Sequence, residues 1–316
     1  MIFTMKIYRS FDEAKYDRNT VLTLGTFDGV HRGHQVLIRY LSSIAARESL
    51  RPMLMTIDPH PQIVLKKPGK PPIELLTTIN ERIDLFEKFG VENLLIIPFS
   101  YEFSRTSPDE FVREFLFRKV GLRKFLIGYD HLFGKNRSGD GSLLDDMGIK
   151  LGFDVEQVQP FFDDGTVISS TKIRKSIKGH EIEKANEMLG YPYRVTGKVV
   201  RGQGRARSLG YPTANIMPED NHKLYPGFGV YLVSSYIDNV KYFGMANIGL
   251  RPTLTEDKTP TLEVNFFNLD MDLYDKILQI SFISFIRKEK KFDGVTGLLD
   301  QIAKDKESCM KMIKEL

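Results

Sequence analysis

The spacing of apolar residues changes once along the chain, near residue 190. Before that point, short apolar runs such as 21–24 and 52–57 alternate with segments like 35–47, in which apolar residues recur at helical spacing. After it, apolar residues recur with a period of two residues, which is typical of β-strands, as in 229–237. The first pattern predicts a doubly wound, parallel α/β sheet. The second predicts antiparallel hairpins that close into a β-barrel.

Further predicted elements complete this organisation. Ser107 and Glu110 have the spacing of a capping box, which marks the start of a helix. Residues 191–193 are the expected junction, so we expect an N-terminal domain over 1–187 and a C-terminal domain over 188–316. The other predicted helices are 80–89, 181–189 and 295–316, the last of them packed against the barrel, and the other predicted strands are 93–98, 124–127, 153–158 and 240–246.

Composition limits the classes of function. With 316 residues, of which 41% are hydrophobic and 27% charged, the chain is long enough for two globular domains. Its net charge of +4, from 45 basic and 41 acidic residues, suits small anionic substrates and is too small to indicate nucleic acid. No signal peptide or membrane span is evident, so we expect a cytoplasmic enzyme without a membrane partner. The single cysteine, Cys309, excludes an internal disulfide and is expected to be a packing residue.

A glycine-rich turn over 25–34 connects the first predicted strand to the first predicted helix. Gly25, Gly29 and Gly33 permit unusual backbone angles and a close approach of a ligand to backbone N–H groups. The start of a helix also favours anions, because its dipole is positive there. The turn therefore predicts a phosphate-binding site.

Two histidines lie in this turn, three residues apart. We predict that His31 and His34 bind the phosphates of a nucleotide and stabilise the charge that develops when one of them is attacked. Surface or core histidines are one alternative, and a zinc pair completed by His60 or His131 is another. His60 also follows the second predicted strand together with Asp58, where the two either line the pocket or form a structural turn.

A second loop rich in glycine and charge, 128–140, follows the strand predicted at 124–127. There Asp130 is a candidate hydrogen-bond acceptor for a ribose or an adenine, and Lys135 and Arg137 are candidates for phosphate contacts. A solvated loop is the alternative.

Three consecutive hydroxyl residues open another helix at 168–174. One hydroxyl would suffice to cap a helix, so three of them followed by two cations favour a phosphate clamp. The residues concerned are Ser169, Ser170, Thr171, Lys172 and Arg174.

The predicted barrel contains a third glycine- and arginine-rich segment, which ends at Thr213 and Asn215. These two side chains offer neutral oxygens that can share a Mg²⁺ ion already held by ATP phosphates. In the strand at 261–266, Glu263 points away from its apolar neighbours, either to solvent or into a polar site. The candidate phosphate-binding residues of the segment are Gly202, Gly204, Arg207 and Gly210.

Several motifs resemble known families. The motif G-x-F-D-G-x-H-x-G-H at 25–34 and I-S-S-T-x-I-R at 168–174 resemble the nucleotidyltransferase superfamily, and most closely its flavin adenylyltransferase branch. P-T-A-N at 212–215 resembles riboflavin kinase, in which it binds the metal of ATP. The order of the motifs resembles that of the bifunctional riboflavin kinase and FAD synthetase family of the prokaryotic type, over essentially the whole chain.

This resemblance implies two reactions. In the C-terminal half, MgATP phosphorylates riboflavin to FMN, with Glu263 as the base and with Thr213 and Asn215 on the metal. In the N-terminal half, FMN attacks the α-phosphorus of a second ATP to give FAD. The residues then implied are His31 and His34 for the transition state, Ser169, Thr171 and Arg174 for pyrophosphate, Gly25, Phe27, Asp28, Gly33, Asp130 and Ser170 for the nucleotide, and Arg287 for the kinase substrate. The family usually has Phe where this chain has His131.

Three alternatives stay open. In the first, only one of the two modules is active. In the second, the N-terminal module adenylylates a different phosphate ester such as phosphopantetheine. The third is a flavin or nucleotide sensor, which binds without turnover and would keep the glycine-rich loops but would not need Glu263, His31 or His34.

Overall fold

The computed structural model describes residues 4–66, 68, 69, 71–128, 134, 139, 141–159, 162, 163, 166–202, 210–250 and 260–316. The chain divides into two compact units, Met1–Ser169 and Ser170–Leu316. The domain limit predicted at 187/188 stays a prediction. The two helices 170–178 and 182–189 follow the boundary at 169/170, and the second of them ends just beyond the predicted limit.

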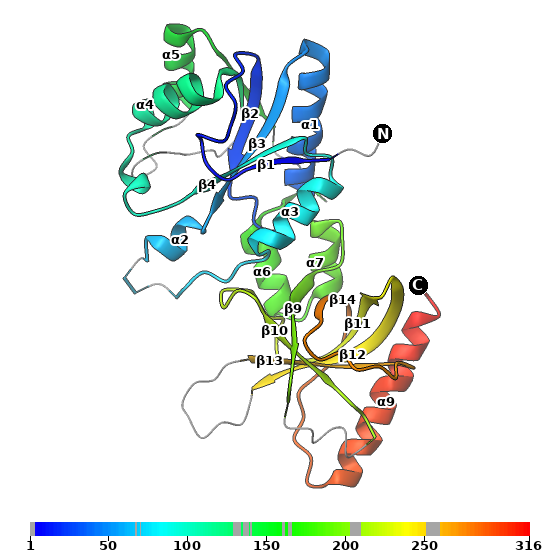
Figure 1. Cartoon of the computed structure of the whole chain (residues 1–316). Coiled ribbons are helices and arrows are strands. Elements are labelled where there is room, and N and C mark those ends of the chain that lie inside the picture. Colours follow the sequence, from blue (N-terminus) through cyan, green and yellow to red (C-terminus); the bar gives the residue numbers. More distant parts are fainter. Residues whose placement is uncertain are drawn as a thin grey trace. The chain divides into compact units, whose positions relative to one another are not determined.

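A parallel sheet forms the centre of the first unit (Figure 1). Among the described residues it has six strands in the order β1-β4-β3-β2-β5-β6, and all neighbouring strands are parallel. The strands are β1 (Lys6–Tyr8), β2 (Thr20–Gly25), β3 (Arg51–Asp58), β4 (Asn93–Pro98), β5 (Leu122–Gly128) and β6 (Asp154–Val158), and a small hairpin of β7 (Phe162–Asp163) and β8 (Thr166–Val167) follows. The predicted α/β class and parallel sheet are confirmed.

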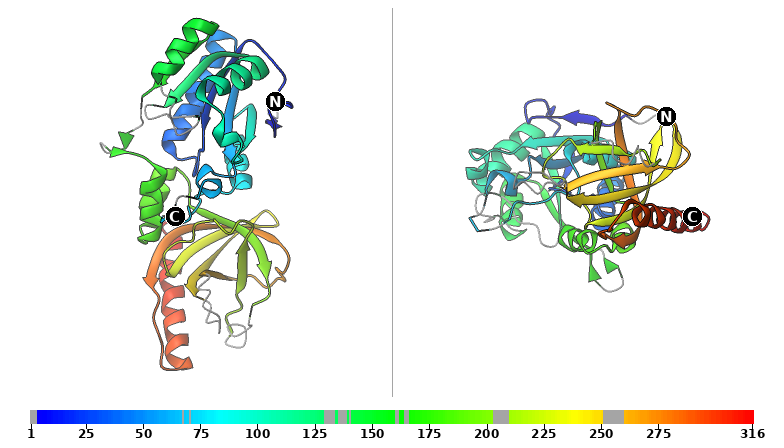
Figure 2. Two further views of the ribbon diagram at one scale, coloured as in Figure 1. Left: turned by 90° about the vertical axis from the view of Figure 1, so that its left-hand side faces the viewer. Right: turned by 90° about the horizontal axis from the view of Figure 1, so that it is seen from below.

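Helices pack on both faces of this sheet (Figures 1 and 2). Ser107 begins one of them as predicted, because its Oγ accepts a hydrogen bond of 3.2 Å from the Glu110 amide. The turns that follow are a π-helix, which the apolar spacing does not distinguish from an α-helix. The helices are α1 (Arg32–Glu48), α2 (Pro61–Val64), α3 (Ile79–Lys88), the 3₁₀ turn η1 (Phe103–Arg105), α4 (Pro108–Glu110), the π-helix η2 (Phe111–Val120) and α5 (Gly141–Leu151).

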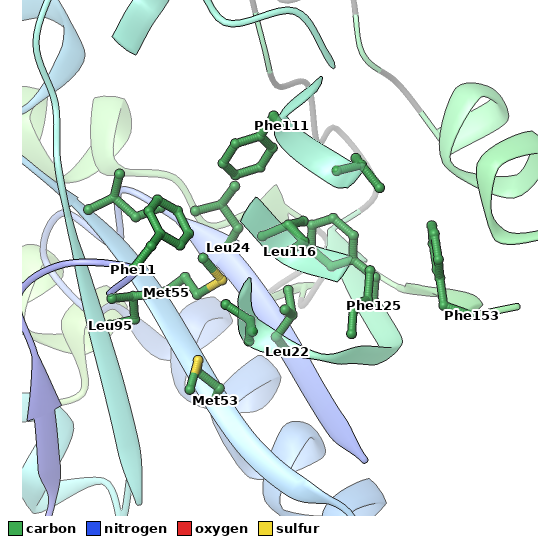
Figure 3. Packing of buried hydrophobic residues seen from close by; sticks show 14 of the residues in the cluster. Phe11, Leu22, Leu24, Met53, Met55, Leu95, Phe111, Leu116, Phe125 and Phe153 are labelled. Carbon is green, nitrogen blue, oxygen red and sulfur yellow. The ribbon is translucent and has the colours of Figure 1, made fainter. Parts of the chain in front are cut away.

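One face of the sheet carries a large apolar core, shown in Figure 3. Leu22 and Leu24 of β2 face this core, and Phe111 and Leu116 of η2 cover it. Because side chains alternate along a strand, Thr23 faces the opposite side of the sheet. Each large apolar side chain that is buried in this way contributes about 1.5–3 kcal/mol. The sheet is therefore a rigid base for the loops at its carboxyl edge.

The second unit is a closed antiparallel barrel, as predicted, with strand order β10-β13-β12-β11-β14-β9. At the turn between β11 and β12, Asp238 and Asn239 have φ angles of 50° and 66°, as a tight two-residue hairpin requires. The strands are β9 (Arg194–Val200), β10 (Ala214–Pro218), β11 (Gly229–Ile237), β12 (Val240–Leu250), β13 (Pro260–Phe266) and β14 (Ile277–Lys288).

Among the described residues of the barrel unit, three segments are helical: α6 (Ser170–Lys178), α7 (Ile182–Leu189) and α9 (Val295–Ile313). In α7, the Asn186 side chain donates to the Phe282 carbonyl at 3.0 Å and accepts from the Tyr193 amide at 2.6 Å. Helix α9 lies along the outside of the barrel (Figure 2), where Cys309 is fully buried in an apolar cluster. In the described part of the chain, no helix is both long and apolar enough to cross a membrane.

Candidate active sites

The first candidate site lies at the point where the strand order of the parallel sheet reverses. The chain proceeds from β2 to β3 and β4 on one side, and β5 and β6 lie on the other side of β2. Open α/β sheets bind ligands at the carboxyl ends of the strands at such a point. The 25–34 turn follows β2 there, and the second predicted loop follows β5. Asp130, His131, Lys135 and Arg137 of that loop lie outside the described residues.

The two histidines of the turn lie against each other. His31 caps α1, and its Nδ1 accepts from the His34 amide at 3.4 Å. The two imidazole rings are stacked, with 3.6 Å between their centroids and 16° between their planes. The structure thus brings this predicted pair together at the N-terminus of α1, where a helix favours anions.

Burial keeps both rings uncharged near neutral pH. It lowers the pKa of His31 to about 4, although the Asp28 carboxylate acts in the opposite direction. It also holds the pKa of His34 well below its usual value, and the neighbouring His31 lowers it further. A neutral imidazole carries one N–H donor. Because Nδ1 of His31 accepts a bond, its proton is assigned to Nε2. Each ring can therefore stabilise phosphate charge as a hydrogen-bond donor.

The Phe27 ring packs against the histidine pair. Its ring is 2% exposed and meets His34 edge to face, with 5.0 Å between the ring centroids. It also contacts Phe86 of α3 in the same manner at 5.8 Å. A Cβ added to Gly25 would lie 3.2 Å from the Phe27 ring, so the small residue at 25 leaves room for this packing. The geometry favours a supporting position for Phe27 beneath the histidines.

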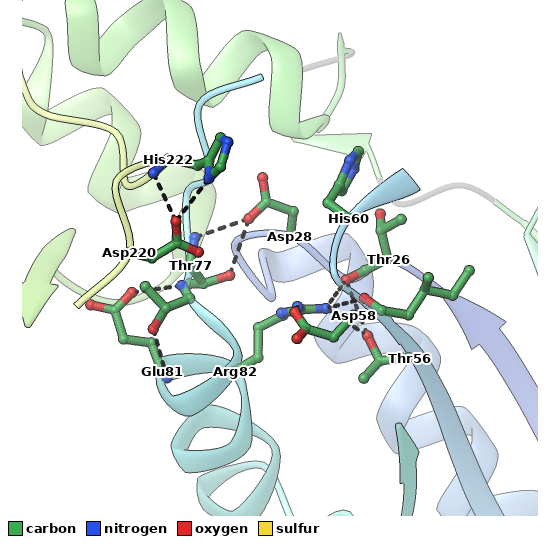
Figure 4. Close-up of polar contacts among 12 residues, drawn as sticks. Thr26, Asp28, Thr56, Asp58, His60, Thr77, Glu81, Arg82, Asp220 and His222 are labelled. Atoms are coloured by element: carbon green, nitrogen blue, oxygen red, sulfur yellow. Dashed lines mark hydrogen bonds and ion pairs between the residues drawn. The ribbon is translucent and has the colours of Figure 1, made fainter. Parts of the chain in front are cut away.

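Asp28 ties the turn to the segment before α3 (Figure 4). One carboxylate oxygen accepts from the Thr77 amide at 2.9 Å, and the other accepts from the Leu76 amide at 3.1 Å. The Thr77 hydroxyl donates to Asp28 at 3.2 Å and accepts from the Gly29 amide at 2.8 Å. Asp28 thus fixes the shape of the turn. Thr77 was not predictable from the sequence, because nothing in the local pattern connects it to residue 28.

A buried arginine joins the carboxyl ends of β2 and β3. Arg82 of α3 forms an ion pair of 2.7 Å with Asp58, and its side chain is 3% exposed (Figure 4). It also donates to the Thr26 carbonyl at 2.9 Å and to the Thr56 hydroxyl at 2.8 Å. His60 caps α2 through its Nδ1. Of the two alternatives left open for Asp58 and His60, these contacts favour the structural turn.

The hydroxyl-rich segment begins α6 within the second unit. Ser169 is the last residue of the first unit and Ser170 the first of the second. Thr171 is exposed and Arg174 is half-buried. These two residues are three apart in a helix and therefore lie on the same face. A role of Ser169, Thr171 and Arg174 in binding pyrophosphate stays a prediction.

The second candidate site is a row of side chains across three strands of the barrel. In the strand register, Glu263 of β13 is paired with Asn215 of β10 on one side and with Asn247 of β12 on the other. Paired residues of neighbouring strands project to the same face with Cβ atoms about 5 Å apart. Glu263 is half-buried, whereas Leu262 and Val264 beside it are buried in the barrel. Glu263 therefore stands between two amides, and our sequence analysis did not foresee Asn247.

The residues beside Glu263 fit a Mg²⁺ ion held by phosphates. Thr213 and Asn215 flank the buried Ala214, so their polar side chains share one face. A Cβ added to Gly202 would collide with the Asn215 amide, so a glycine there leaves this face open. Mg²⁺ keeps several waters and needs few protein ligands, so two neutral oxygens suffice beside phosphate. Among the described residues, no group of three or more His, Cys, Asp or Glu side chains could hold a metal.

Two other residues predicted for the kinase site, Gly204 and Arg207, fall outside the described residues. Gly210 has a φ of 82°, which favours glycine, and it borders a cavity of about 400 Å³. Aromatic and polar residues line this cavity, which our sequence analysis did not locate: Tyr211, Pro212, Asn265, Phe266, Phe267, Asn268, Leu269, Asp270 and Lys306.

Arg287 contacts protein groups with all three guanidinium nitrogens. Its Nε lies 2.9 Å and 3.0 Å from the two carboxylate oxygens of Asp305, and a third nitrogen donates to the Lys288 carbonyl. The remaining guanidinium nitrogen lies 2.8 Å from a carboxylate oxygen of Asp305, and this ion pair is mostly buried. These contacts fasten α9 to β14. A role of Arg287 in substrate binding stays a prediction.

Together, a glycine-rich turn with two histidines at the switch point of a parallel sheet and a Thr, Asn and Glu row on a closed barrel are the arrangement expected of a two-part nucleotide-dependent transferase. A family model described as FAD synthetase matches residues 13–172, and one described as riboflavin kinase matches residues 189–313. The chain therefore belongs to the family of bifunctional riboflavin kinase/FMN adenylyltransferases.

Relatives with both activities in their names align along nearly the whole chain. The bifunctional riboflavin kinase/FMN adenylyltransferase of Listeria monocytogenes is 35% identical, over 95% of this chain and 94% of its own. That of Escherichia coli is 34% identical over 90% of both chains. A crystal structure from Streptococcus pneumoniae, described as a macrolide-efflux protein, has 31% identity and a TM-score of 0.84 and covers 98% of this chain and 99% of its own. It therefore shares the fold of both units.

Proposed function

We propose that this chain makes FAD from riboflavin in two ATP-dependent steps, with FMN as the intermediate. The observation that carries the proposal is the presence of two separate arrangements suited to phosphates, the stacked His31–His34 pair in its turn and the row around Glu263. We assign adenylyl transfer to residues 1–187 and phosphoryl transfer to residues 188–316, in a cytoplasmic enzyme. This assignment agrees with the order of the two family models.

In the kinase step, the ribityl hydroxyl of riboflavin attacks the γ-phosphorus of ATP, and ADP leaves. Glu263 accepts the hydroxyl proton, and its place between two neutral amides leaves the carboxylate available for this task. Thr213 and Asn215 hold Mg²⁺, which when bound neutralises phosphate charge. The observed register of β10 and β13 places Asn215 directly beside Glu263.

In the adenylylation step, an FMN phosphate oxygen attacks the α-phosphorus of a second ATP. The bond between the α-phosphorus and the bridging oxygen breaks, and pyrophosphate leaves. His31 and His34 donate hydrogen bonds to the phosphate oxygens as negative charge develops on them. We assign the binding of pyrophosphate to Ser169, Thr171 and Arg174, and that of the nucleotide to the neighbouring Ser170 and to the residues predicted in the two loops.

The products made from riboflavin and ATP test the proposal directly. We expect FMN to form first and FAD to follow, as separated by reversed-phase chromatography with fluorescence detection. FMN without FAD would refute the two-step scheme. Conversion of phosphopantetheine but not of FMN would instead support the alternative substrate. Binding of flavin and nucleotide without any product would support a sensor.

A further inference from the structure

The ladder between β10 and β13 stops just before the predicted metal ligand Thr213. Its pairs are Ile216 with Leu262, Asn215 with Glu263, and Ala214 with Val264. Pro212 lies beyond this end and has no amide hydrogen, so it cannot donate to a continued ladder. The peptide that precedes Ala214 therefore lies beyond the end of the ladder, at the position where Thr213 must be held.

A side chain connects the two strands just beyond the end of the ladder. Nδ2 of Asn265 donates to the Pro212 carbonyl oxygen at 2.8 Å. Continuing the register by one pair places Asn265 opposite Thr213. Asn265 is two residues from Glu263 and therefore projects to the same face of β13. One amide thus connects the strand of the base to the peptide that precedes Thr213.

We infer that Asn265 is a positioning residue for the kinase step. It holds the start of β10 against β13, so that Thr213 and Asn215 keep their places relative to Glu263. This inference rests on the proposed function, because it concerns the assigned metal ligands and base. Asn265 also lines the cavity beside Gly210, so a direct contact with a substrate is the competing explanation that the experiment must separate.

Three variants of the full-length chain isolate the contact. Asn265→Leu has a similar volume and removes the donor. Asn265→His keeps an N–H donor at the atom equivalent to Nδ2, since Nδ1 is also bonded to Cγ. Thr261→Val is the matched control, because Thr261 lies on the same strand and face and its hydroxyl bonds to the Gly249 carbonyl at 3.2 Å, towards β12 instead of β10.

The first measurement needs no turnover. Hydrogen–deuterium exchange, followed by mass spectrometry of peptides over 210–218 and 240–250, is recorded with and without Mg²⁺ and ADP. We expect Asn265→Leu to accelerate exchange at the start of β10 about fivefold and to weaken its protection by Mg²⁺ and ADP, as the loss of one hydrogen bond implies. Asn265→His should restore both, and Thr261→Val should leave 210–218 unchanged.

The second measurement is the Mg²⁺ dependence of FMN formation. We expect Asn265→Leu to raise the Mg²⁺ concentration for half-maximal rate about five- to tenfold. If it raises only the KM for riboflavin or ATP while exchange of 210–218 stays normal, Asn265 is a substrate contact and the inference is wrong. It is also wrong if Thr261→Val has the same effects, or if Asn265→Leu has none.

The failure of this inference differs from failure of the proposed function. A wild-type chain that forms no FMN would refute the kinase proposal and the positioning role together. Wild-type FMN formation with an unchanged Asn265→Leu variant would refute the positioning role alone. If Asn265→Leu does not fold, Asn265→His decides: normal Mg²⁺ dependence and exchange support the role of the donor, and altered values for this folded variant contradict it.

Discussion

The two candidate sites are supported in different ways. In the first unit, the residues of the turn rest on a buried layer, in which Phe27 lies under His34, Asp28 binds the Thr77 amide and Arg82 joins β2 to β3. In the second unit, Glu263 and Asn215 are half-buried on the outside of a barrel and owe their positions to strand register. Changes beneath the first site should therefore reduce stability and activity together, whereas changes in the second should reduce activity alone.

The largest expected effect is that of Glu263→Gln. This change removes the assigned base and keeps the size of the side chain, so FMN formation should fall about 10²- to 10⁴-fold. FAD formation from supplied FMN and the thermal unfolding temperature should stay at wild-type values. Product chromatography and calorimetry measure the three quantities. Normal FMN formation would contradict the role of Glu263 as the base.

Breaking the buried ion pair under the first site should affect folding as well. Arg82→Met removes the ion pair with Asp58 and the hydrogen bond to the Thr26 carbonyl, which we expect to cost about 3 kcal/mol in the free energy of unfolding of the first unit. FAD formation should fall with it. FMN formation should persist at temperatures where the second unit is folded, even when the first unit has unfolded.

The control for this prediction is Arg113→Met. Arg113 forms an ion pair with Asp109 that is largely exposed to solvent, and such pairs contribute little. Denaturant unfolding of both variants, followed by far-UV circular dichroism, gives the difference. Equal unfolding midpoints for the two variants would contradict the supporting role of the buried pair.

Acid should destabilise the first unit through its histidines. The pKa of His31 is near 6.5 when unfolded and about 4 when folded, so the unfolded state takes up the proton first as the pH falls. The stability that depends on a neutral His31 is complete above pH 6.5 and is lost progressively towards pH 4, by about 3 kcal/mol. His34 changes in the same direction.

A variant isolates this contribution from that of acidic side chains. His31→Asn combined with His34→Asn removes both titrating groups, so its unfolding free energy should vary less with pH between 7 and 4 than that of the wild type. Denaturant titrations at several pH values provide the comparison. Parallel curves for the two proteins would show that the histidines are not buried in the neutral form.

The smallest expected effect is that of Phe27→Leu. This change keeps an apolar side chain in the core but loses the edge contacts with His34 and Phe86, at about 1–2 kcal/mol. Because His34 loses its support, FAD formation should fall several-fold while FMN formation is unchanged. Thermal unfolding and the two product assays measure this. A loss of stability without a loss of FAD formation would contradict the role of Phe27 in positioning His34.

Elements with strong local signals were predictable, and others were not. The strands around the 25–34 turn, the helix that begins after Ser107 and the hairpin at Asp238 and Asn239 agree with the structure. β1 has only three residues, too few to show a period, and the π-helix η2 has the same apolar face that an α-helix would have. These elements depend on packing against the sheet.

The candidate residues divide in the same way. Sequence motifs by themselves indicated His31, His34, Thr213 and Asn215, because glycine-rich turns and alternating strands impose recognisable local spacing. Strand alternation left two orientations open for Glu263, and only the resemblance to riboflavin kinase singled it out as the base. They could not indicate Thr77, Arg82 or Asn265, whose partners are far away in sequence.

The sequence of this protein thus determined its two fold classes, their order and the kind of chemistry that each site offers. All of these depend on short-range spacing and on residue type. Only the tertiary structure decided which side chains support the sites, that Asp28 is held by backbone amides and that Glu263 stands between Asn215 and Asn247. The reason is physical: burial and strand register arise from contacts between distant segments, and these exist only once the chain has folded.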